Sequence, residues 1–296
     1  VNPKIVYTSV SGFGQTGPDR RRAGVNLIIE AFSGPLSVTG EPGQMPVRPG
    51  VQTADVFGAL FATYATLASL VGAGRTGEGR IADVSLVEAS IAAAAWEAAE
   101  YLETGQVPQP MGNKHRLTAP YQLFETSDRR YVAVGTPNNM LFEKFMQVIG
   151  LEQHLSDPRF KTYAERKANE TPLLALVEPA IRAMHSDKLE AELMKVGVPC
   201  AKVNNFKEVF EHPQIVARNV VNTVEHPRLG TMKVTRNPVL LDHDGPGVPR
   251  PSPMLGEHSQ AILTELGYDR SAIDALVASG VTRLATPAQP KMTAAE

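Results

Sequence analysis

The stretch KIVYTSVSGFGQTGP, residues 4–18, predicts a β-strand that leads into a glycine-rich loop. Residues 4–10 are mostly β-branched or aromatic, which favours a strand, and the glycines and proline after them favour a loop. GFGQTG matches the G-x-G-x-x-G pattern, which binds a dinucleotide only when a helix starts at the third glycine. Here PDRRR follows without apolar periodicity, so the pattern favours a simple glycine-rich turn.

The clearest helix pattern is DVFGALFATYATLASLVGA, residues 55–73, where large apolar side chains recur at helical spacing. Its stretch Val56–Val71 includes glycine, threonine and serine, so no apolar run reaches the roughly 20 residues that span a bilayer. We expect this stretch to be a buried helix. A brief strand is expected at 80–84, and the S-x-x-E pattern from Ser85 predicts the capping box of an alanine-rich helix to about residue 103.

The pattern changes after residue 104. Proline and glycine at 105–113 indicate a domain boundary, and residues 119–236 predict a smaller α+β domain of ordinary size. The chain then returns through a proline-rich segment, a helix at 258–266 and an expected disordered tail from 281 to 296. Within 119–236 the expected elements are a hairpin at 121–124 and 131–134, helices near 139–149, 171–184, 186–196 and 206–211, and strands at 197–203, 220–225 and 231–236.

The composition limits the possible partners. The 296 residues include 29 Lys and Arg against 31 Asp and Glu, a net charge of −2, which gives no electrostatic reason to expect nucleic acid or an anionic membrane. The single cysteine, Cys200, excludes an internal disulfide framework and is expected to be a buried structural thiol. The histidines lack metal-ligand spacing, so no metal site is predicted. His212 and His226 precede prolines and are expected in turns, and His243 in a solvated loop.

Two places in the sequence could carry chemistry. Asp55 lies at the start of the best helix, where the positive helix end keeps a carboxylate ionised. Its residue type fits a plain N-cap, or a nucleophile that attacks an acyl carbon and splits one acyl transfer into two steps; the spacing leaves both open. Gly112, Asn113, Lys114 and His115 form a polar loop, either a solvated linker or a loop that closes on a substrate.

Several segments, taken in order, resemble the class III coenzyme A transferases. This family includes formyl-CoA transferase, crotonobetainyl-CoA:carnitine CoA-transferase and the α-methylacyl-CoA racemases. The resemblance covers roughly residues 2–268, and the order of the segments is more specific than any one of them. They are IVYTSVSGFGQTGP (5–18), TGEP (39–42), PGVQTAD (49–55), GEGRIADVSL (77–86), APY (119–121), GVPC (197–200), HPQ (212–214), EHPRLG (225–230) and LGEH (255–258).

The resemblance implies a role for individual residues. Asp55 falls where the family places its nucleophilic aspartate, which becomes an aspartyl-CoA thioester through anhydride intermediates, whereas Asp83 is structural by the same resemblance. The family's racemases carry a histidine after the glycine of an Ala-Gly pair. This chain has Val25 after Gly24, so CoA transfer is favoured over racemisation. Gly24, Val25 and Asn26 are implied to lie near the bound thioester.

The loop from Gly112 to His115 falls near the family's glycine-rich active-site loop, although only Gly112 in it is a glycine. The family begins with a Rossmann-like part that supplies most contacts to coenzyme A. This chain opens with Val1-Asn2-Pro3 directly before a strand. The resemblance therefore implies that the N-terminal part of the family's fold is lacking.

The expected fold is α/β. The resemblance implies an open parallel sheet with alanine-rich helices over 1–104, a linker with the active-site loop at 105–118, the small domain at 119–236, and a return segment to the large domain at 237–280. It also implies an interlocked homodimer.

The implied activity is acyl-CoA:carboxylate CoA transfer in the cytoplasm, with an acyl-CoA and a small carboxylic acid as substrates and no permanently bound cofactor. Alternatives are an α-methylacyl-CoA racemase or epimerase, and a non-catalytic dimerisation fragment of the same family. A nucleotide-dependent oxidoreductase is more distant.

Overall fold

The computed structural model describes residues 2–242, 245 and 250–285. The chain divides into two compact units, Val1–Val203 and Asn204–Glu296. This division differs from the predicted small domain at 119–236, whose last strands lie in the second unit. Because this division reflects compactness alone, the predicted domain organisation stays a prediction. The predictions for His243 and for residues 286–296 fall on positions outside the described residues.

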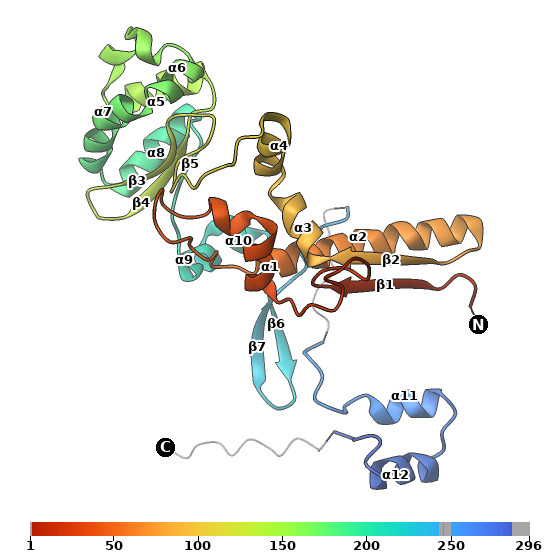
Figure 1. The fold of residues 1–296 in the computed structure, drawn as a ribbon. Helices are drawn as coiled ribbons and strands as arrows, with labels where there is room; N and C mark the ends of the chain where they lie inside the picture. Colours follow the sequence, from red (N-terminus) through yellow and green to blue (C-terminus); the bar gives the residue numbers. More distant parts are fainter. Residues whose placement is uncertain (1, 243–244, 246–249, 286–296) are drawn as a thin grey trace, which may run out of the picture. The chain divides into compact units, whose positions relative to one another are not determined.

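The first unit begins with two parallel strands, β1 (Val6–Ser11) and β2 (Arg80–Ser85). Between them in sequence come the helices α1 (Asn26–Ser33) and α2 (Thr53–Thr76) and the short 3₁₀ helix η1 (Pro35–Val38). Figure 1 shows α2 running alongside the strand pair. The prediction of an α/β fold with a parallel sheet is confirmed.

The predicted helix over 85–103 is two helices, α3 (Leu86–Ala93) and α4 (Ala95–Thr104). Ser85 caps the first of them, because its hydroxyl accepts a hydrogen bond of 3.1 Å from the Glu88 N–H. The break falls at Ala94, whose ψ of 38° leaves the helical region. Nothing in the residue type signals this break, because alanine favours a helix.

Helix α2 is more exposed than the sequence predicted. Its apolar stretch was expected to be buried. Only 17% of the 18 most apolar consecutive residues of α2 is buried, so this expectation is wrong. By length and composition alone, α2 could cross a bilayer. This differs from the prediction that no apolar run in the sequence is long enough to do so. Its small, uncharged residues lengthen the apolar segment. One side of α2 packs on β1, β2 and α3, and Leu60, Leu67 and Leu70 are each more than half exposed.

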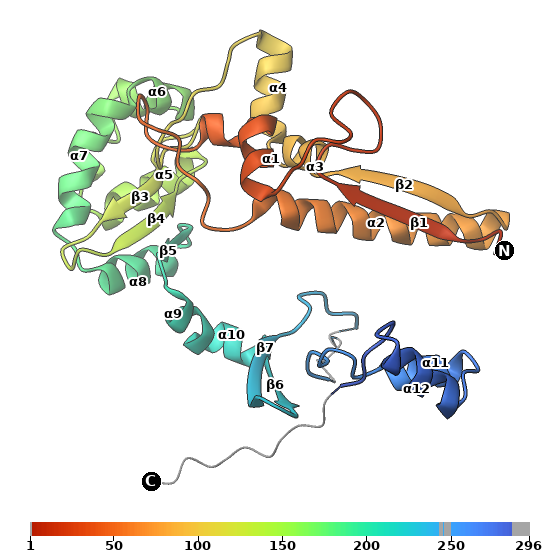
Figure 2. The same ribbon diagram turned by 60° about the horizontal axis from the view of Figure 1, so that its bottom comes forward.

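The rest of the first unit is a three-stranded antiparallel sheet, in the order β3-β4-β5, with helices packed on one face (Figure 2). The predicted hairpin and helices are confirmed. The elements are β3 (Tyr121–Glu125), β4 (Tyr131–Gly135), α5 (Asn139–Val148), η2 (Glu152–His154), η3 (Pro158–Phe160), α6 (Tyr163–Ala168), α7 (Glu170–Arg182), α8 (Ser186–Val196) and β5 (Cys200–Lys202). The core residues exposed by 2% or less are Phe124, Val132, Val134, Phe142, Phe145, Met146, Phe160, Leu173, Val177, Ile181, Leu189, Leu193 and Val198.

The half-buried, hydrogen-bonded carboxylate of Asp128 in this part predicts a pH dependence of stability. The Ser186 hydroxyl donates to Asp128 Oδ2 at 2.7 Å, and Ser186 N–H and the Thr126 hydroxyl donate to Oδ1. These bonds hold the pKa of the Asp128 carboxyl well below its usual range. The stabilisation is therefore complete above the unfolded pKa of about 3.9 and is lost as the pH falls towards the lower folded pKa.

In the unmodified protein the unfolding free energy should decrease as the pH falls from about 5 to about 2. We expect this decrease to be smaller in Asp128→Asn, as measured by urea denaturation at each pH. Asp274→Asn, which removes an exposed carboxylate paired with Arg270, is the control and should retain the slope of the unmodified protein. Equal slopes for Asp128→Asn and the unmodified protein would contradict the prediction.

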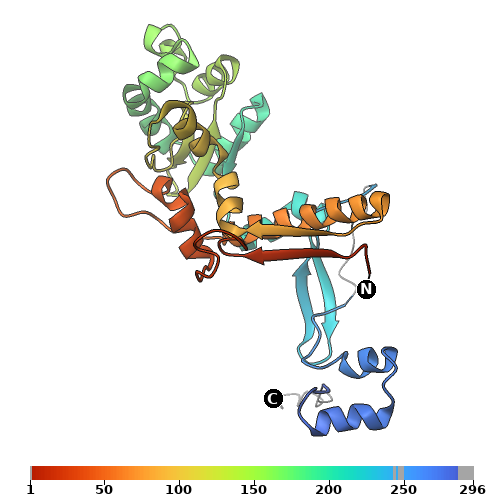
Figure 3. The same ribbon diagram turned by 45° about the vertical axis from the view of Figure 1, so that its right-hand side comes forward.

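The second unit contains a helical pair at its start, followed by a β-hairpin and a second helical pair. Figure 3 shows the hairpin and the second helical pair. Its elements are α9 (Phe206–Glu211), α10 (Pro213–Ala217), β6 (Val221–His226), β7 (Gly230–Thr235), α11 (Ser259–Glu265) and α12 (Arg270–Ala278). The predicted helix at 206–211, both strands and the helix at 258–266 are confirmed. Helix α12 was not predicted, although Asp269 caps it by accepting from the Ala272 N–H.

Candidate functional site

Asp55 is the third residue of α2, and its environment is set by α1. The side-chain oxygen of Asn26 accepts hydrogen bonds from Ala54 N (3.0 Å) and Asp55 N (3.3 Å). Asn26 is only 6% exposed. Asn26, predicted to lie near the thioester, and Asp55, the predicted nucleophile, are 29 positions apart in sequence and are therefore in direct contact.

Glu30 holds the same helix end, one turn further along α1. Its Oε1 accepts from Thr53 N at 3.2 Å and from the Thr53 hydroxyl in a short hydrogen bond. Residues four apart share a helix face, so Asn26 and Glu30 present their acceptors together. Glu30 is fully buried, and its Oε2, like the Asn26 Nδ2, has no partner among the described residues. Glu30 was not predicted from the sequence, because no local pattern marks a carboxylate that caps a different helix.

Asp55 does not cap its own helix. Gln52 occupies the N-cap position without a side-chain bond, and the acceptors for the first turn come from α1. The plain N-cap alternative for Asp55 is therefore wrong. The residue is exposed, and within residues 2–242, 245 and 250–285 its carboxylate makes no hydrogen bond or ion pair. The nucleophile interpretation stays a prediction.

Gly24 and Val25 lie immediately before α1. Val25 is 68% exposed at the N-cap position of α1 and carries no acid or base. A Cβ added at Gly24 would lie 2.8 Å from Ile29 Cδ1 and 3.2 Å from the Phe13 ring, so a larger residue there would displace the start of α1. Of the three residues predicted near the thioester, Asn26 alone contacts the backbone of Asp55.

Asn26 gives a prediction for stability. Asn26→Ala leaves two buried or half-buried N–H groups at the start of α2 without an acceptor, and we expect a loss of about 2 kcal/mol of unfolding free energy. The matched control is Asn138→Ala, which removes an exposed cap that accepts from Leu141 N at 2.9 Å and should cost about 1 kcal/mol. Urea denaturation measures both. A smaller loss for Asn26→Ala than for Asn138→Ala would contradict the role of Asn26.

The glycine-rich loop after β1 is a turn held by Asp83. The Gln15 N–H donates to Asp83 Oδ2 at 2.9 Å. No helix begins at Gly17, because α1 starts only at Asn26. A dinucleotide site would need a helix N-terminus at this point, and none begins at Gly17. The expected glycine-rich turn is confirmed. Asp83, expected to be structural, has a structural partner.

The predicted active-site loop is fixed at Gly112. This residue has a φ of 63°, which favours glycine, and its N–H donates to Gly40 O at 2.8 Å. A Cβ at this position would collide with the Glu41 carboxylate. Gly112 thus joins the 112–115 loop to the segment that leads from η1 towards Asp55.

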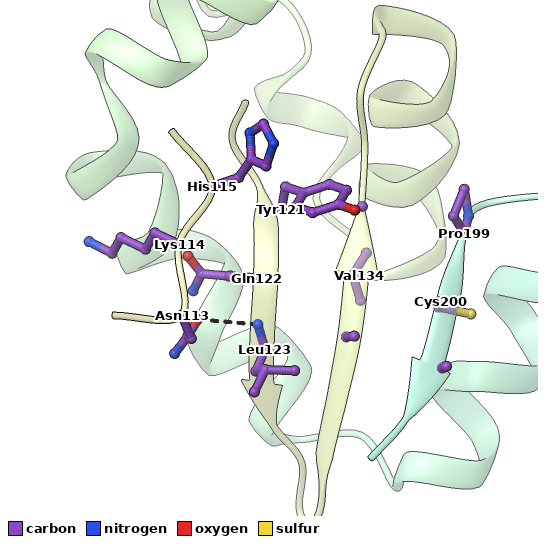
Figure 4. A pocket seen from close by; sticks show the side chains of 12 residues that line it. Asn113, Lys114, His115, Tyr121, Gln122, Leu123, Val134, Pro199 and Cys200 are labelled. Carbon is purple, nitrogen blue, oxygen red and sulfur yellow. Dashed lines mark hydrogen bonds between the residues drawn. The ribbon is translucent and has the colours of Figure 1, made fainter. Parts of the chain in front are cut away.

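The same loop borders a hollow of about 380 Å³ on the open face of the β3-β4-β5 sheet (Figure 4). Asn113 is anchored there, because its Oδ1 accepts from Leu123 N at 3.2 Å. The His115 ring lies edge-on to Tyr121, with ring centroids 4.7 Å apart, and the Tyr121 ring covers Gly135. His115 Nδ1 accepts from the Leu117 N–H at 3.1 Å. The hollow therefore has an aromatic wall with one histidine.

Lys114 and Cys200 add little to this hollow. Figure 4 shows the Lys114 side chain pointing away from the strands. The Cys200 thiol contacts Glu190 O at 3.6 Å, and burial raises the pKa of this thiol, which disfavours a reactive thiolate. Asp55 and Asn26 do not line the hollow, so the structure leaves the two predicted parts of the site as separate groups. In the described part of the chain, no group of three or more metal-ligand residues is assembled.

Comparison with known proteins identifies the family. Human succinyl-CoA:glutarate CoA-transferase is 34% identical over 282 residues, which cover 95% of this chain and 64% of that protein. Succinate–glutarate CoA-transferase of Agrobacterium fabrum is 31% identical, with 90% of this chain and 66% of that protein covered. The chain thus spans about two thirds of the length of these curated relatives.

Solved structures agree with this relationship. The crystal structure of a CAIB/BAIF family protein from Brucella suis is 35% identical, with a TM-score of 0.76, and the match covers 90% of this chain and 68% of that one. Rv3272 from Mycobacterium tuberculosis is 22% identical with a TM-score of 0.77 over 88% of this chain and 69% of that one, which shows the fold alone. The model of CoA-transferase family III matches residues 1–259. The chain belongs to CoA-transferase family III.

Proposed function

We propose that this chain carries the carboxylate nucleophile of an acyl-CoA:carboxylate CoA-transferase, and that Asp55 is this nucleophile. The observation that supports the proposal most directly is the free carboxylate of Asp55 at the start of a 24-residue helix. A cap or an ion pair would occupy this carboxylate. Asn26 and Glu30 perform the capping instead, and Asp55 remains exposed.

The proposed reaction begins when an Asp55 oxygen attacks the thioester carbon of the donor. The C–S bond breaks, CoA leaves as a thiolate, and a mixed anhydride forms. The thiolate then attacks the Asp55 carbonyl carbon, which releases the donor acid as a carboxylate and leaves an aspartyl-CoA thioester. The acceptor carboxylate repeats the two steps in reverse order, so that acyl-CoA product leaves and the Asp55 carboxylate is restored.

The N-terminus of α2 assists the proposed reaction through its partial positive charge, and not through unpaired backbone N–H groups. The positive end of α2 stabilises the carboxylate before attack. The N–H groups of residues 53–55 already donate to Asn26 and Glu30, so they are not free to bind an oxyanion. We infer that the donors that stabilise the tetrahedral intermediates come from other segments.

The substrates follow from the relatives' names. Several relatives are named for transfer of CoA from succinyl-CoA to a dicarboxylic acid, among them glutarate. We therefore propose a short dicarboxylate as the acceptor and an acyl-CoA such as succinyl-CoA as the donor. Racemisation is less well supported, because Val25 supplies no second acid or base to exchange a proton.

Covalent trapping tests the proposal. The protein is incubated with succinyl-CoA, treated with hydroxylamine or borohydride, and digested for peptide mapping by mass spectrometry. We expect modification only on the peptide that carries Asp55, and none in Asp55→Ala. The control is Asp83→Asn, which removes another carboxylate of the same unit but keeps an acceptor for Gln15. This variant should still be modified at Asp55. An unmodified Asp55 in folded protein would contradict the proposal.

We also propose that the chain associates with a second copy of itself. The observation behind this is α2, whose leucines are more than half exposed at positions 60, 67 and 70. Apolar side chains that gather on an exposed face often mark a surface that contacts another protein. Analytical ultracentrifugation measures the association, and a monomer across the micromolar range would contradict it.

A further inference from the structure

The second unit contains a hollow of about 550 Å³ that lies far along the chain from Asp55 and from the 112–115 loop. Three of its lining residues belong to the turn between β6 and β7 and its flank, two to the segment before α11, and two to the segment after α12. They are His226, Arg228, Leu229, Met254, Leu255, Arg283 and Leu284. Three segments distant in sequence therefore meet at this hollow.

The segments are tied together by backbone bonds. The Ala285 N–H donates to Gly256 O at 3.1 Å, which holds the segment after α12 against the segment before α11. Gly256 has a φ of 78°, and a Cβ there would lie 2.5 Å from Arg283 O. A larger residue could not occupy this position without separating the two segments. The hollow is thus a built feature of the second unit.

His226 contributes a buried hydrogen-bond donor to the hollow. It is only 9% exposed, and its Nδ1 accepts from Arg228 N at 3.1 Å and from Leu229 N at 3.0 Å. These two bonds require an unprotonated Nδ1, so in the neutral ring the proton lies on Nε2. Nε2 makes no hydrogen bond within the described residues. The turn uses only Nδ1 of His226, as an acceptor for two backbone N–H groups. The Nε2–H group is therefore available to donate to a ligand.

Two arginines line the same hollow without an acidic partner. Neither Arg228 nor Arg283 forms an ion pair within the part of the chain that the structure describes. The carboxylate nearest in sequence to the lining segment before α11 is Glu257, which accepts from Met254 N at 2.6 Å and does not line the hollow. Two guanidinium groups and one imidazole N–H make an electropositive site. Guanidinium groups bind carboxylates and phosphates through paired N–H donors.

The remaining lining is apolar and unusually exposed. Leu255 is 83% exposed and Leu229 is 58% exposed, and Met254 and Leu284 complete the apolar part of the wall. Ligand sites commonly combine an apolar lining with a few polar groups that orient the ligand. This lining fits a ligand that carries an apolar body next to its charge.

We infer that this hollow binds a small amphiphilic anion, in which a phosphate or carboxylate group contacts Arg228, Arg283 and His226 Nε2 and an alkyl body contacts the leucines. The site is independent of Asp55 and of the proposed transferase chemistry. It assigns a binding function to the second unit.

Calorimetric titration of the full chain with hexyl phosphate, hexanoate, inorganic phosphate and hexanol tests the inference. We expect saturable binding of hexyl phosphate or hexanoate, weaker binding of inorganic phosphate, and no saturable binding of hexanol. The stronger of the two alkyl anions identifies whether phosphate or carboxylate is preferred. Equal binding of hexanol, or no saturable binding of either alkyl anion, would overturn the inference.

Variants separate the site from general charge effects. Arg228→Ala and Arg283→Ala should each weaken binding about tenfold or more. His226→Asn keeps a side-chain acceptor for the turn but removes the Nε2–H, and it should weaken binding while circular dichroism stays unchanged. The matched control is Arg270→Ala, an arginine of the same unit that pairs with Asp274 on α12; it should bind like the unmodified protein. Equal weakening by Arg270→Ala would overturn the assignment to this hollow.

Discussion

Asp55→Asn is expected to lower the rate of CoA transfer by about 10³-fold or more, because the neutral amide cannot attack a thioester. The substitution keeps the size of the side chain and leaves the backbone N–H that donates to Asn26. Asp55 makes no side-chain hydrogen bond within the described residues, so the folded state loses no bond in the variant. The effect should therefore fall on activity and not on stability.

The measurement is the initial rate of transfer from succinyl-CoA to glutarate, with unfolding free energy from urea denaturation beside it. Asp83→Asn is the matched control, since it changes the same chemical group 28 residues away and retains an acceptor for Gln15 N. We expect that control to keep activity within about tenfold. Comparable losses from both variants would contradict a role specific to Asp55. An unchanged rate in Asp55→Asn would exclude Asp55 outright.

The elements of this fold could be predicted where the signal is local. Strand β1 follows from β-branched residues that end in a glycine-rich loop, and α2 follows from apolar side chains at helical spacing. The hairpin of β3 and β4 follows from two strand-forming runs separated by a polar turn. In each case the residues that decide the element lie within the element or next to it.

Other features could not be predicted because their causes lie elsewhere in the chain. The α2 N-terminus is capped from α1, by Asn26 across 28 residues and by Glu30 across 23. The exposure of α2 depends on which other segments pack against it, and the sequence of α2 does not specify them. The break at Ala94 lies in a run of alanines with no helix breaker. The place of Asp55 at a helix start made it a candidate, and the resemblance favoured the nucleophile over the N-cap. Only the structure shows that its side chain caps no helix.

Arg166 is the strongest example of a residue whose role the sequence concealed. It lies in α6 and is fully buried, although arginine is mostly a surface residue. Its guanidinium donates to Asn139 Oδ1 (3.0 Å), Phe160 O (3.1 Å) and Ala119 O (3.3 Å). It also lies 4.3 Å above the Phe142 ring centroid. Burial lowers the pKa of Arg166. The acceptors and the ring offset part of the cost of the desolvated charge, while Nη2 has no partner among the described residues.

Arg166→Ala is expected to lower the free energy of unfolding by about 3–5 kcal/mol, measured by urea denaturation. The loss has two parts, because the variant opens a cavity and leaves three carbonyl or amide acceptors without their donor. Arg166→Met separates them, since methionine fills most of the space but donates nothing. If the unpaired acceptors dominate, Arg166→Met should be nearly as unstable as Arg166→Ala.

The control for Arg166 is Arg159→Ala, seven residues earlier, where the side chain is 53% exposed and pairs with Asp157. Exposed pairs contribute little, so we expect a change within about 1 kcal/mol. The comparison decides what the buried arginine does. A loss in Arg166→Ala no larger than in Arg159→Ala would show that water replaces the guanidinium at no cost. A stable Arg166→Met beside an unstable Arg166→Ala would show that the side chain acts by filling space, and that its charge is dispensable, as hydrophobic replacements of buried ion pairs have shown elsewhere.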